Sequence, residues 1–324
     1  MRVLFWGTPD FGLPSLEAMR EAGHEIAGVV TNPDRPAGRG RGGRGRALRA
    51  SPVKRWALEA GVPILQPSRP GEGTFLDEAR RLGPDISVVA AYGRILPSEA
   101  LDLPPLGSLN VHASLLPALR GAAPINWAII RGHRETGVSI QRMVVELDAG
   151  PVLGQTRIPI HATMTAGELY GEAAAAGGTR VVAVLAEVAA CRALETPQDD
   201  TRATWAPKLD RGAARIDWSR SAEELGRWLR GCDPWPAAWT SLAGRSVQCF
   251  EPAIFPAREV GGGEAPDAAA PPGTVLEAHP VRGLSVATGS GVLQVGAVKP
   301  AGGRRMASAA WVRGVADLKG ARFD

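Results

Sequence analysis

An amide and an imidazole stand two residues apart in the segment “GSLNVHASLLPALRGAAPI”, which runs from Gly107 to Ile125. Residues i and i+2 of a β-strand project from the same face, so the side chains of Asn110 and His112 are expected to lie side by side. Both can donate hydrogen bonds to one developing negative charge, as in an oxyanion site, where one donor contributes about 3 kcal/mol of transition-state stabilisation. The spacing is equally compatible with an Asn and a His that only cap backbone groups at a strand end.

A carboxylate follows 36 residues after His112, at Asp148 in the segment “ELDAG”. By itself an Asp-x-Gly sequence is typical of an ordinary turn, which is the simpler interpretation. If Asp148 lies within reach of His112, its carboxylate would fix the tautomer and the orientation of the imidazole. The spacing in the sequence does not give that distance.

The other candidate groups form no comparable pattern. The segment “GTPDFG” lacks the Gly-Lys-Ser/Thr of a P-loop and the spacing of a dinucleotide site, so it predicts a tight turn. The three cysteines are scattered and no histidine clusters with them, so no metal site is predicted. The remaining histidines are expected at surface or capping positions: His24, His133, His161 and His279.

One segment of the chain is strongly basic. The net charge is +4, yet eight Lys and Arg residues and no acidic residue lie between Arg35 and Arg55, and removing those eight charges leaves −4 for the rest. In the centre, “GRGRGGRGR”, glycines interleave with arginines, which disfavours regular structure and predicts a cationic loop. Such a loop suits a polyanionic partner, because each neutralised phosphate releases counterions, although a solvated insertion without a partner has the same composition.

The scaffold for these groups follows from an alternation of short apolar runs and helical patterns. The apolar runs are “RVLFWG”, “EIAGVV”, “PILQP”, “DISVVAAYG” and “SLNVH”. This alternation, with continuously apolar strands, predicts an α/β fold with a mostly parallel, Rossmann-like sheet covered on both faces. “GVSIQRMVV” and “GPVLGQTRIPI” are expected to add a final hairpin, joined by the turn that contains Asp148. Asn110 and His112 then fall where strands of an open α/β sheet end, which is where ligands bind.

The length of 324 residues exceeds that of a usual single domain, so two domains are expected. Residues 1–190 are expected to form the first domain, with the basic loop inserted at about residues 35–50. Residues 191–212 are expected to form a linker along the surface. In residues 213–324, short strands separated by Gly and Pro predict a small, OB-like β-barrel.

Several features predict a cytoplasmic protein. No apolar run reaches the roughly 20 residues needed to span a bilayer. The N-terminal “MRVLFWGTPDFG” has the pattern of a first strand and not of a signal peptide. Without an export signal the three cysteines are expected to be reduced thiols. No heptad repeat or obvious apolar edge indicates obligate assembly, so a monomer is expected.

At “NVHASLLP”, “RGAAPI” and “LDAG” the chain resembles the formyltransferases that use 10-formyltetrahydrofolate, most closely the members that act on methionyl-tRNA. The similarity continues in order through “TNPDRPAGRG”, “SPVK”, “AAYGRILP”, “ETGVSIQRM”, “ARIDWS”, “DPWPAAW” and “GTVLEA”. It implies a catalytic domain followed by a tRNA-binding C-terminal domain. It further implies an enzyme that transfers a formyl group from 10-formyltetrahydrofolate, without a metal, to the α-amine of methionyl initiator tRNA in support of translation initiation.

The resemblance also implies roles for individual residues. Asn110, His112 and Asp148 would be the catalytic residues. The folate would contact two short segments: Ser114, Leu115, Leu116 and Pro117, which would line its pocket, and Ala91, Tyr92 and Gly93, whose backbone would face the pterin. The basic loop, with Arg39, Arg41 and Arg44, would contact the acceptor end of the tRNA. Ala118 departs from the family, whose members commonly have a basic residue after “SLLP”.

Two other functions are compatible with parts of this pattern. A folate-dependent formyltransferase could act on a small amine, either an amino sugar nucleotide or glycinamide ribonucleotide, but the second domain and the Arg-rich loop favour a larger substrate. A non-catalytic RNA-binding homologue would have no use for the trio Asn110, His112 and Asp148. Formyl transfer to methionyl-tRNA is therefore the expected function.

Overall fold

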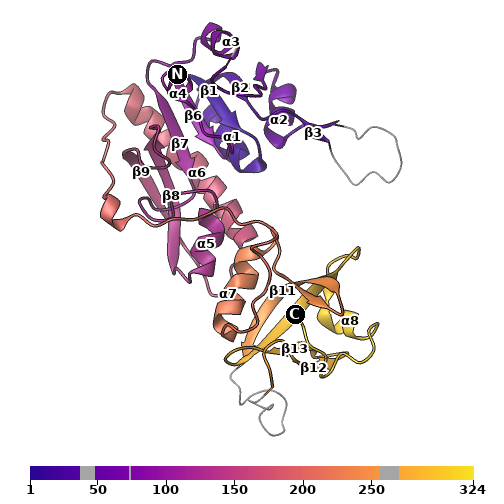
Figure 1. Ribbon diagram of the computed structural model, residues 1–324. Coiled ribbons are helices and arrows are strands. Elements are labelled where there is room, and N and C mark those ends of the chain that lie inside the picture. Colours follow the sequence, from indigo (N-terminus) through magenta and orange to yellow (C-terminus); the bar gives the residue numbers. More distant parts are fainter. Residues whose placement is uncertain (37–47, 73, 256–269) are drawn as a thin grey trace. The chain divides into compact units, whose positions relative to one another are not determined.

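The structure is a computed structural model that describes residues 1–36, 48–72, 74–255 and 270–324 (Figure 1). The chain folds into two compact units, each assembled from separate stretches of sequence. The N-terminal unit comprises Met1–Pro124, Glu135–Pro159 and Tyr170–Pro207, and the C-terminal unit comprises Ile125–Arg134, Ile160–Leu169 and Lys208–Asp324.

A seven-stranded sheet forms the centre of the N-terminal unit, in the order β5-β2-β1-β6-β7-β8-β9. The strands are β1 (Arg2–Gly7), β2 (Glu25–Val30), β5 (Ile64–Leu65), β6 (Ile86–Ala90), β7 (Ser108–His112), β8 (Glu135–Arg142) and β9 (Val152–Pro159). The first five in this order run parallel, and β8 and β9 form an antiparallel hairpin at the edge. The predicted α/β fold with a mostly parallel sheet is confirmed.

The helices of this unit are α1 (Leu13–Glu21), α2 (Pro52–Ala60), α3 (Phe75–Arg81), α4 (Ser98–Leu101) and most of α6 (Ala166–Ala189), with 3-10 turns η1 (Asp10–Gly12) and η2 (Asp200–Arg202). Helices α1 to α4 lie between strands of this unit in the sequence, and α6 follows its last strand. Local chemistry sets the bounds of α2: the Ser51 hydroxyl accepts a hydrogen bond from the Lys54 backbone N–H, and Gly61 ends the helix at φ +67°. Two short strands, β3 (Arg35–Pro36) and β4 (Leu48–Arg49), pair antiparallel on either side of residues 37–47.

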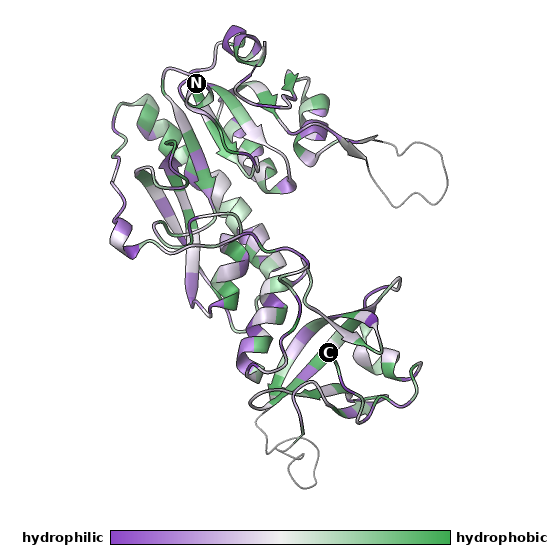
Figure 2. Ribbon diagram, in the orientation of Figure 1, coloured by the Kyte–Doolittle hydropathy of each residue, from purple (hydrophilic) through white to green (hydrophobic). Residues whose placement is uncertain are grey.

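The core of this unit lies against strands that are apolar on both faces. Residues 3–6 of β1 and all of β6 are buried, as expected for parallel strands covered on two sides. Figure 2 shows hydrophobic residues along several strands of this sheet. The fully buried Trp6 contacts the rings of Phe75 and Tyr92 edge to face, at centroid distances of 5.5 and 5.3 Å. Its indole N–H donates to the Ser87 hydroxyl at 3.1 Å, which satisfies the one polar atom of the side chain.

Helix α6 packs closely against the sheet through glycine. A Cβ placed on Gly177 would lie 2.7 Å from Cγ1 of Val111, in the middle of β7. The helix therefore approaches this strand more closely than any larger residue allows. Because successive strand residues alternate in direction, the face of β7 that carries Val111 against α6 is opposite to the face that carries Asn110 and His112.

The C-terminal unit is built on an antiparallel sheet in the order β10-β11-β14-β13-β12, with β15 paired to β14. Its elements are β10 (Trp239–Leu242), β11 (Arg245–Phe255), β12 (Val275–His279), β13 (Gly283–Ala287), β14 (Val292–Pro300), β15 (Met306–Ala307), α7 (Ala222–Cys232), α8 (Ser308–Val312) and most of α5 (Pro124–Ile130). The predicted small β-barrel is confirmed as an antiparallel half-barrel sheet. Ser221 and Glu224 close a capping box at the start of α7.

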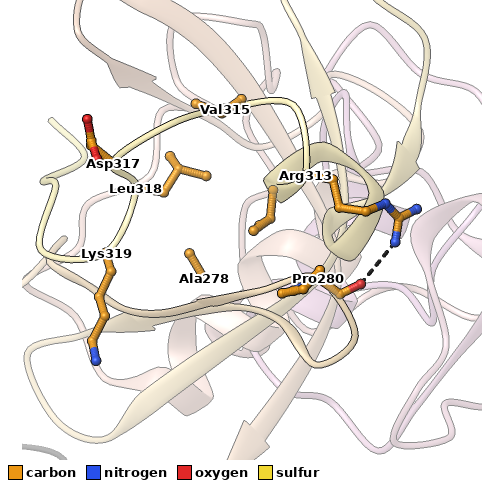
Figure 3. Close-up of a pocket in the computed structure, with 8 residues that line it drawn as sticks. Ala278, Pro280, Arg313, Val315, Asp317, Leu318 and Lys319 are labelled. Atoms are coloured by element: carbon orange, nitrogen blue, oxygen red, sulfur yellow. Dashed lines mark hydrogen bonds between the residues drawn. The ribbon is translucent and has the colours of Figure 1, made fainter.

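An open pocket of about 590 Å³ lies in the C-terminal unit, beside the ends of β12 and α8 (Figure 3). It is lined by Ala278, Pro280, Val312, Arg313, Val315, Asp317, Leu318 and Lys319. The Arg313 guanidinium donates a hydrogen bond to the Pro280 carbonyl at 3.0 Å, which fixes one wall. None of these residues belongs to the site predicted from the sequence.

The close approach of α6 predicts opposite effects for two Gly-to-Ala substitutions on the same helix. Gly177→Ala would force a methyl group against Val111 and should lower the free energy of unfolding by about 1–3 kcal/mol. Gly171→Ala is the control, because a Cβ there meets nothing within 4 Å, and it should raise the stability by about 0.5–1 kcal/mol. Urea unfolding of both variants measures the difference, and equal effects would contradict the packing described.

Burial also predicts how the three cysteines react. Burial raises the pKa of the Cys232 and Cys249 thiols to about 12, so both are protonated at neutral pH, whereas Cys191 is exposed. Because the thiolate is the reactive form, a disulfide reagent at pH 8 should modify one thiol quickly in the folded protein and all three after unfolding. Rapid modification of more than one thiol in the folded protein would contradict this burial.

Candidate active site

The last residues of β7 and the strand beside it carry four polar side chains on one face. Asn110 is half-buried and His112 is buried, with 6% of the residue exposed. The antiparallel register places Gln141 of β8 opposite Asn110, and Ser139 opposite His112. Cross-strand partners project from the same face of a sheet. Gln141 and Ser139 are therefore two residues apart on β8, as Asn110 and His112 are on β7, and all four side chains share one face.

The turn between β8 and β9 brings Asp148 to this surface. Its Oδ1 atom lies 3.6 Å from His112 Nδ1, and only 10% of its side chain is exposed. Three donors face the carboxylate: the backbone N–H of Gly121 at 2.8 Å from Oδ2, and Gln141 Nε2 at 3.0 Å and Asn110 Nδ2 at 3.5 Å from Oδ1. The backbone of Asp148 has φ +52°, a conformation that Asp tolerates better than most residues. The three predicted catalytic residues therefore lie together.

The imidazole of His112 is held from both sides. Its Nε2 atom lies 3.0 Å from the carbonyl oxygen of Leu119, in the loop that follows the strand, while Nδ1 faces Asp148. Because both ring nitrogens face oxygen acceptors, the ring donates to both only when both nitrogens carry protons. The distance of 3.6 Å on the Asp148 side exceeds a hydrogen bond, so this side of the ring is less tightly engaged than the Leu119 side.

The loop predicted to line a folate pocket is fixed to the hairpin by its backbone. The Leu116 N–H donates to the Ser139 hydroxyl at 3.0 Å, and the Leu116 carbonyl accepts from Gln155 Nε2 at 2.9 Å. Ser114 is buried and its hydroxyl donates to the Ala118 carbonyl at 2.6 Å. Leu116 is buried as well, whereas Leu115 and Pro117 are half-buried. Of the four predicted pocket residues, Leu115 and Pro117 are thus the two that retain partial exposure.

The second predicted folate segment lies directly after β6. Ala91 and Gly93 are exposed and have positive φ angles of +53° and +78°. The side chain of Tyr92 points into the core, and burial raises the pKa of its phenol. The Tyr92 carbonyl accepts a hydrogen bond from Asn32 Nδ2 at 2.7 Å. Any ligand contact made by this segment would thus involve the backbone of Ala91 and Gly93 and not the phenol ring.

A second polar cluster joins the ends of the β3–β4 ribbon to the sheet. Lys54 Nζ lies 2.5 Å from an oxygen of Asp34 and 2.8 Å from Gln66 Oε1. Gln66 Nε2 in turn donates to Asp34 at 3.0 Å. The hydrogen bonds from Lys54 and Gln66 lower the pKa of the Asp34 carboxyl. Arg39, Arg41 and Arg44, predicted to contact tRNA, lie outside the described residues.

Two glutamines that the sequence did not single out belong to the candidate site. Gln141 could have been found, because it falls in a predicted strand whose antiparallel pairing would place it beside Asn110. Gln198 comes 50 residues after Asp148, yet its Nε2 atom donates to the Asp148 carbonyl at 2.8 Å. It lies in the segment expected to be a linker, and no periodic pattern marks it.

Within residues 1–36, 48–72, 74–255 and 270–324, no three His, Cys, Asp or Glu side chains are grouped so that they could hold a metal ion. Over that same portion of the sequence, no helix combines the length and the hydropathy that crossing a membrane requires.

Two known protein families match the chain, one in its N-terminal part and one in its C-terminal part. The family described as “Formyl transferase” matches residues 1–185, and “Formyl transferase, C-terminal domain” matches residues 208–316. The chain is 44% identical over 323 residues to a methionyl-tRNA formyltransferase of Thiobacillus denitrificans, covering 100% of this chain and 99% of the relative. It is 42% identical over 314 residues to a methionyl-tRNA formyltransferase of Moorella thermoacetica, covering 97% of this chain and 96% of the relative.

Among solved structures, the fold is similar to that of HypX from Aquifex aeolicus in complex with tetrahydrofolic acid. The TM-score is 0.63 at 19% sequence identity, and the match covers 98% of this chain and 47% of HypX. At this level of identity the similarity concerns the fold alone.

Proposed function

Because the chain belongs to the formyltransferase family, we propose that it transfers the formyl group of 10-formyltetrahydrofolate to the α-amine of methionyl initiator tRNA. Full-length relatives at 42–44% identity that are methionyl-tRNA formyltransferases support this substrate pair. The observation that carries the chemistry is the convergence of Asn110, His112 and Asp148, with 3.6 Å between the imidazole and the carboxylate.

In this proposal the amine nitrogen attacks the formyl carbon directly. Asn110 and His112 share one face of β7 at the end of the strand, and both donate hydrogen bonds to the formyl oxygen as it becomes negatively charged. His112 donates from Nδ1, because Nε2 is engaged with the Leu119 carbonyl, whereas the 3.6 Å between Nδ1 and Asp148 exceeds a hydrogen bond. The bond between the formyl carbon and N10 of the folate then breaks. Two buried hydroxyls near the site, Ser114 and Ser139, donate to backbone carbonyls, which supports direct transfer over a route through a seryl ester.

In this proposal Asp148 has two roles: it positions His112 and it assists proton transfer. Its carboxylate orients His112 from the Nδ1 side, while the Leu119 carbonyl holds Nε2. The amine loses one proton when it forms the new C–N bond, and N10 of the departing folate gains one. Asp148 assists the transfer of this proton from the amine towards N10. The three hydrogen-bond donors around the carboxylate keep it in place during that transfer.

The remaining functional assignments rest on charge, family and local placement. Ser114, Leu115, Leu116 and Pro117 line the folate pocket, and the backbone of Ala91, Tyr92 and Gly93 faces the pterin. The basic loop and the C-terminal domain, residues 213–324, bind the tRNA. The protein acts as a cytoplasmic monomer, with a catalytic domain of residues 1–190 and a linker of residues 191–212.

Replacing either His112 or Asp148 should strongly reduce catalysis and leave tRNA binding intact. His112→Asn and Asp148→Asn are each expected to lower kcat by about 10²–10⁴-fold, because each removes a group that acts on the transition state. The KM for methionyl-tRNA should stay within about threefold of the wild-type value. His24→Asn is the matched control and should change neither constant by more than about twofold. Turnover within tenfold of wild type in both site variants would contradict the assigned roles.

The basic loop should contribute to the affinity for tRNA through charge. Replacing Arg39, Arg41 and Arg44 together by Ser should raise the KM for methionyl-tRNA and reduce the slope of log KM against log salt by about one per lost phosphate contact. The control replaces three exposed arginines elsewhere, Arg20, Arg81 and Arg192, and so removes the same net charge. An equal change of slope in the two triple variants would show that the loop has no specific part in binding.

A further inference from the structure

Residues 196–206, here called the strap, run along the loop that follows β7. The strap lies in the segment expected to be a linker, yet it is bonded into the N-terminal unit at both ends. Thr196 pairs with Val152 at the start of β9 through two backbone hydrogen bonds of 2.8 and 2.9 Å. At the other end the Arg120 N–H donates to the Thr204 carbonyl at 2.8 Å, and the Ala206 N–H donates to the Arg120 carbonyl at 2.7 Å.

Gln198 is the strap residue that connects most directly to the candidate active site. Its Nε2 atom donates to the carbonyl of Asp148 at 2.8 Å and to the carbonyl of Gly150 at 2.7 Å. Its Oε1 atom accepts two hydrogen bonds from the guanidinium of Arg120, at 3.0 Å from Nε and 2.8 Å from Nη2. An amide with both ends engaged in this way has one orientation, because a flipped amide would place its NH₂ group against the guanidinium.

Arg120 fixes this arrangement from the loop side. The residue is only 5% exposed, although it carries a permanent charge. Its one carboxylate partner in the described residues, Asp200, lies 2.7 Å from Nη2 and has an 80% exposed side chain. A guanidinium is costly to bury without full pairing. The ion pair with the exposed Asp200 does not by itself account for the burial of Arg120. The two hydrogen bonds from Arg120 to Gln198, which set the orientation of the Gln198 amide, explain it better.

The strap holds both groups that flank the imidazole of His112. On the Nδ1 side it holds the main chain of Asp148 through Gln198. On the Nε2 side, the Thr204 hydroxyl accepts a hydrogen bond at 2.9 Å from the N–H of Leu119, the residue whose carbonyl contacts the ring. Asp148 and Leu119 both have positive φ angles, +52° and +59°, which these external hydrogen bonds help to maintain.

We propose that the strap is a positioning element of the active site, with Gln198 as its principal positioning residue and Arg120 as the group that orients Gln198. This inference rests on the proposed function, because its effect is exerted on formyl transfer. The strap side chains touch neither substrate in this proposal. They set the positions of Asp148 and Leu119, and through them the orientation of His112. A loss of the strap contacts therefore lowers kcat and leaves the binding of both substrates largely unchanged.

Two variants of the full-length protein test this inference. Gln198→Glu keeps the contact with Arg120 but replaces the donor to the Asp148 and Gly150 carbonyls by an oxygen. It should lower kcat at least tenfold, with the KM values for methionyl-tRNA and 10-formyltetrahydrofolate within threefold of wild type. Thr204→Val is isosteric at an exposed position, so it preserves folding and should lower kcat threefold or more. Thr201→Val, in the same strap, removes only a bond to Asp199 and is the control.

A spectroscopic readout separates positioning from stability. The ring nitrogen resonances of His112, followed by ¹⁵N NMR of histidine-labelled protein, should shift in both test variants and stay unchanged in the control. A kcat within twofold of wild type, or unshifted His112 resonances, in a folded Thr204→Val variant would overturn the inference. If wild-type protein itself transferred no formyl group to methionyl-tRNA, the proposed function would fail, whereas the His112 resonances would still decide the role of the strap.

Discussion

The burial of the Asp148 carboxylate among three N–H donors is the constraint on which the candidate site depends. The Asp148 side chain is 10% exposed and meets three N–H donors from three different parts of the chain. An ionised carboxylate loses much of its hydration in such a place, and only well-aimed donors offset that loss. The donors therefore require β7, β8 and the loop at Gly121 to hold one mutual arrangement. His112 gains a fixed neighbour as a result.

The sheet topology explains how these parts meet. Strand β7 continues the parallel series and ends at His112, while β8 runs back beside it and presents Gln141 opposite Asn110. The turn after β8 then returns Asp148 to the same face. At Gly150 in this turn, a Cβ would collide with the Arg142 carbonyl oxygen, so no larger residue fits there. The change from parallel to antiparallel pairing thus brings two distant segments of sequence to one place.

Much of the scaffold could be predicted from local patterns, because burial on both faces makes strands continuously apolar. The runs “RVLFWG”, “EIAGVV” and “SLNVH” coincide with β1, β2 and β7. That Asn110 and His112 lie side by side could be predicted because they are two residues apart in a strand. The position of Asp148 relative to them could not, since it depends on the register of the hairpin and on the turn. Gln198 could not be found at all, because it acts through tertiary hydrogen bonds that leave no periodic signal.

The order of the strap in the chain has a consequence for how the protein is made. Asn110, His112 and Asp148 are all synthesised before residue 150, but Gln198 and Thr204 follow about fifty residues later. Domains commonly begin to fold from the N-terminus during synthesis. A nascent chain that ends at residue 190 would hold the complete trio on its sheet and yet lack the segment that secures Asp148 and Leu119. The three predicted catalytic residues are therefore synthesised before the strap that holds them in position.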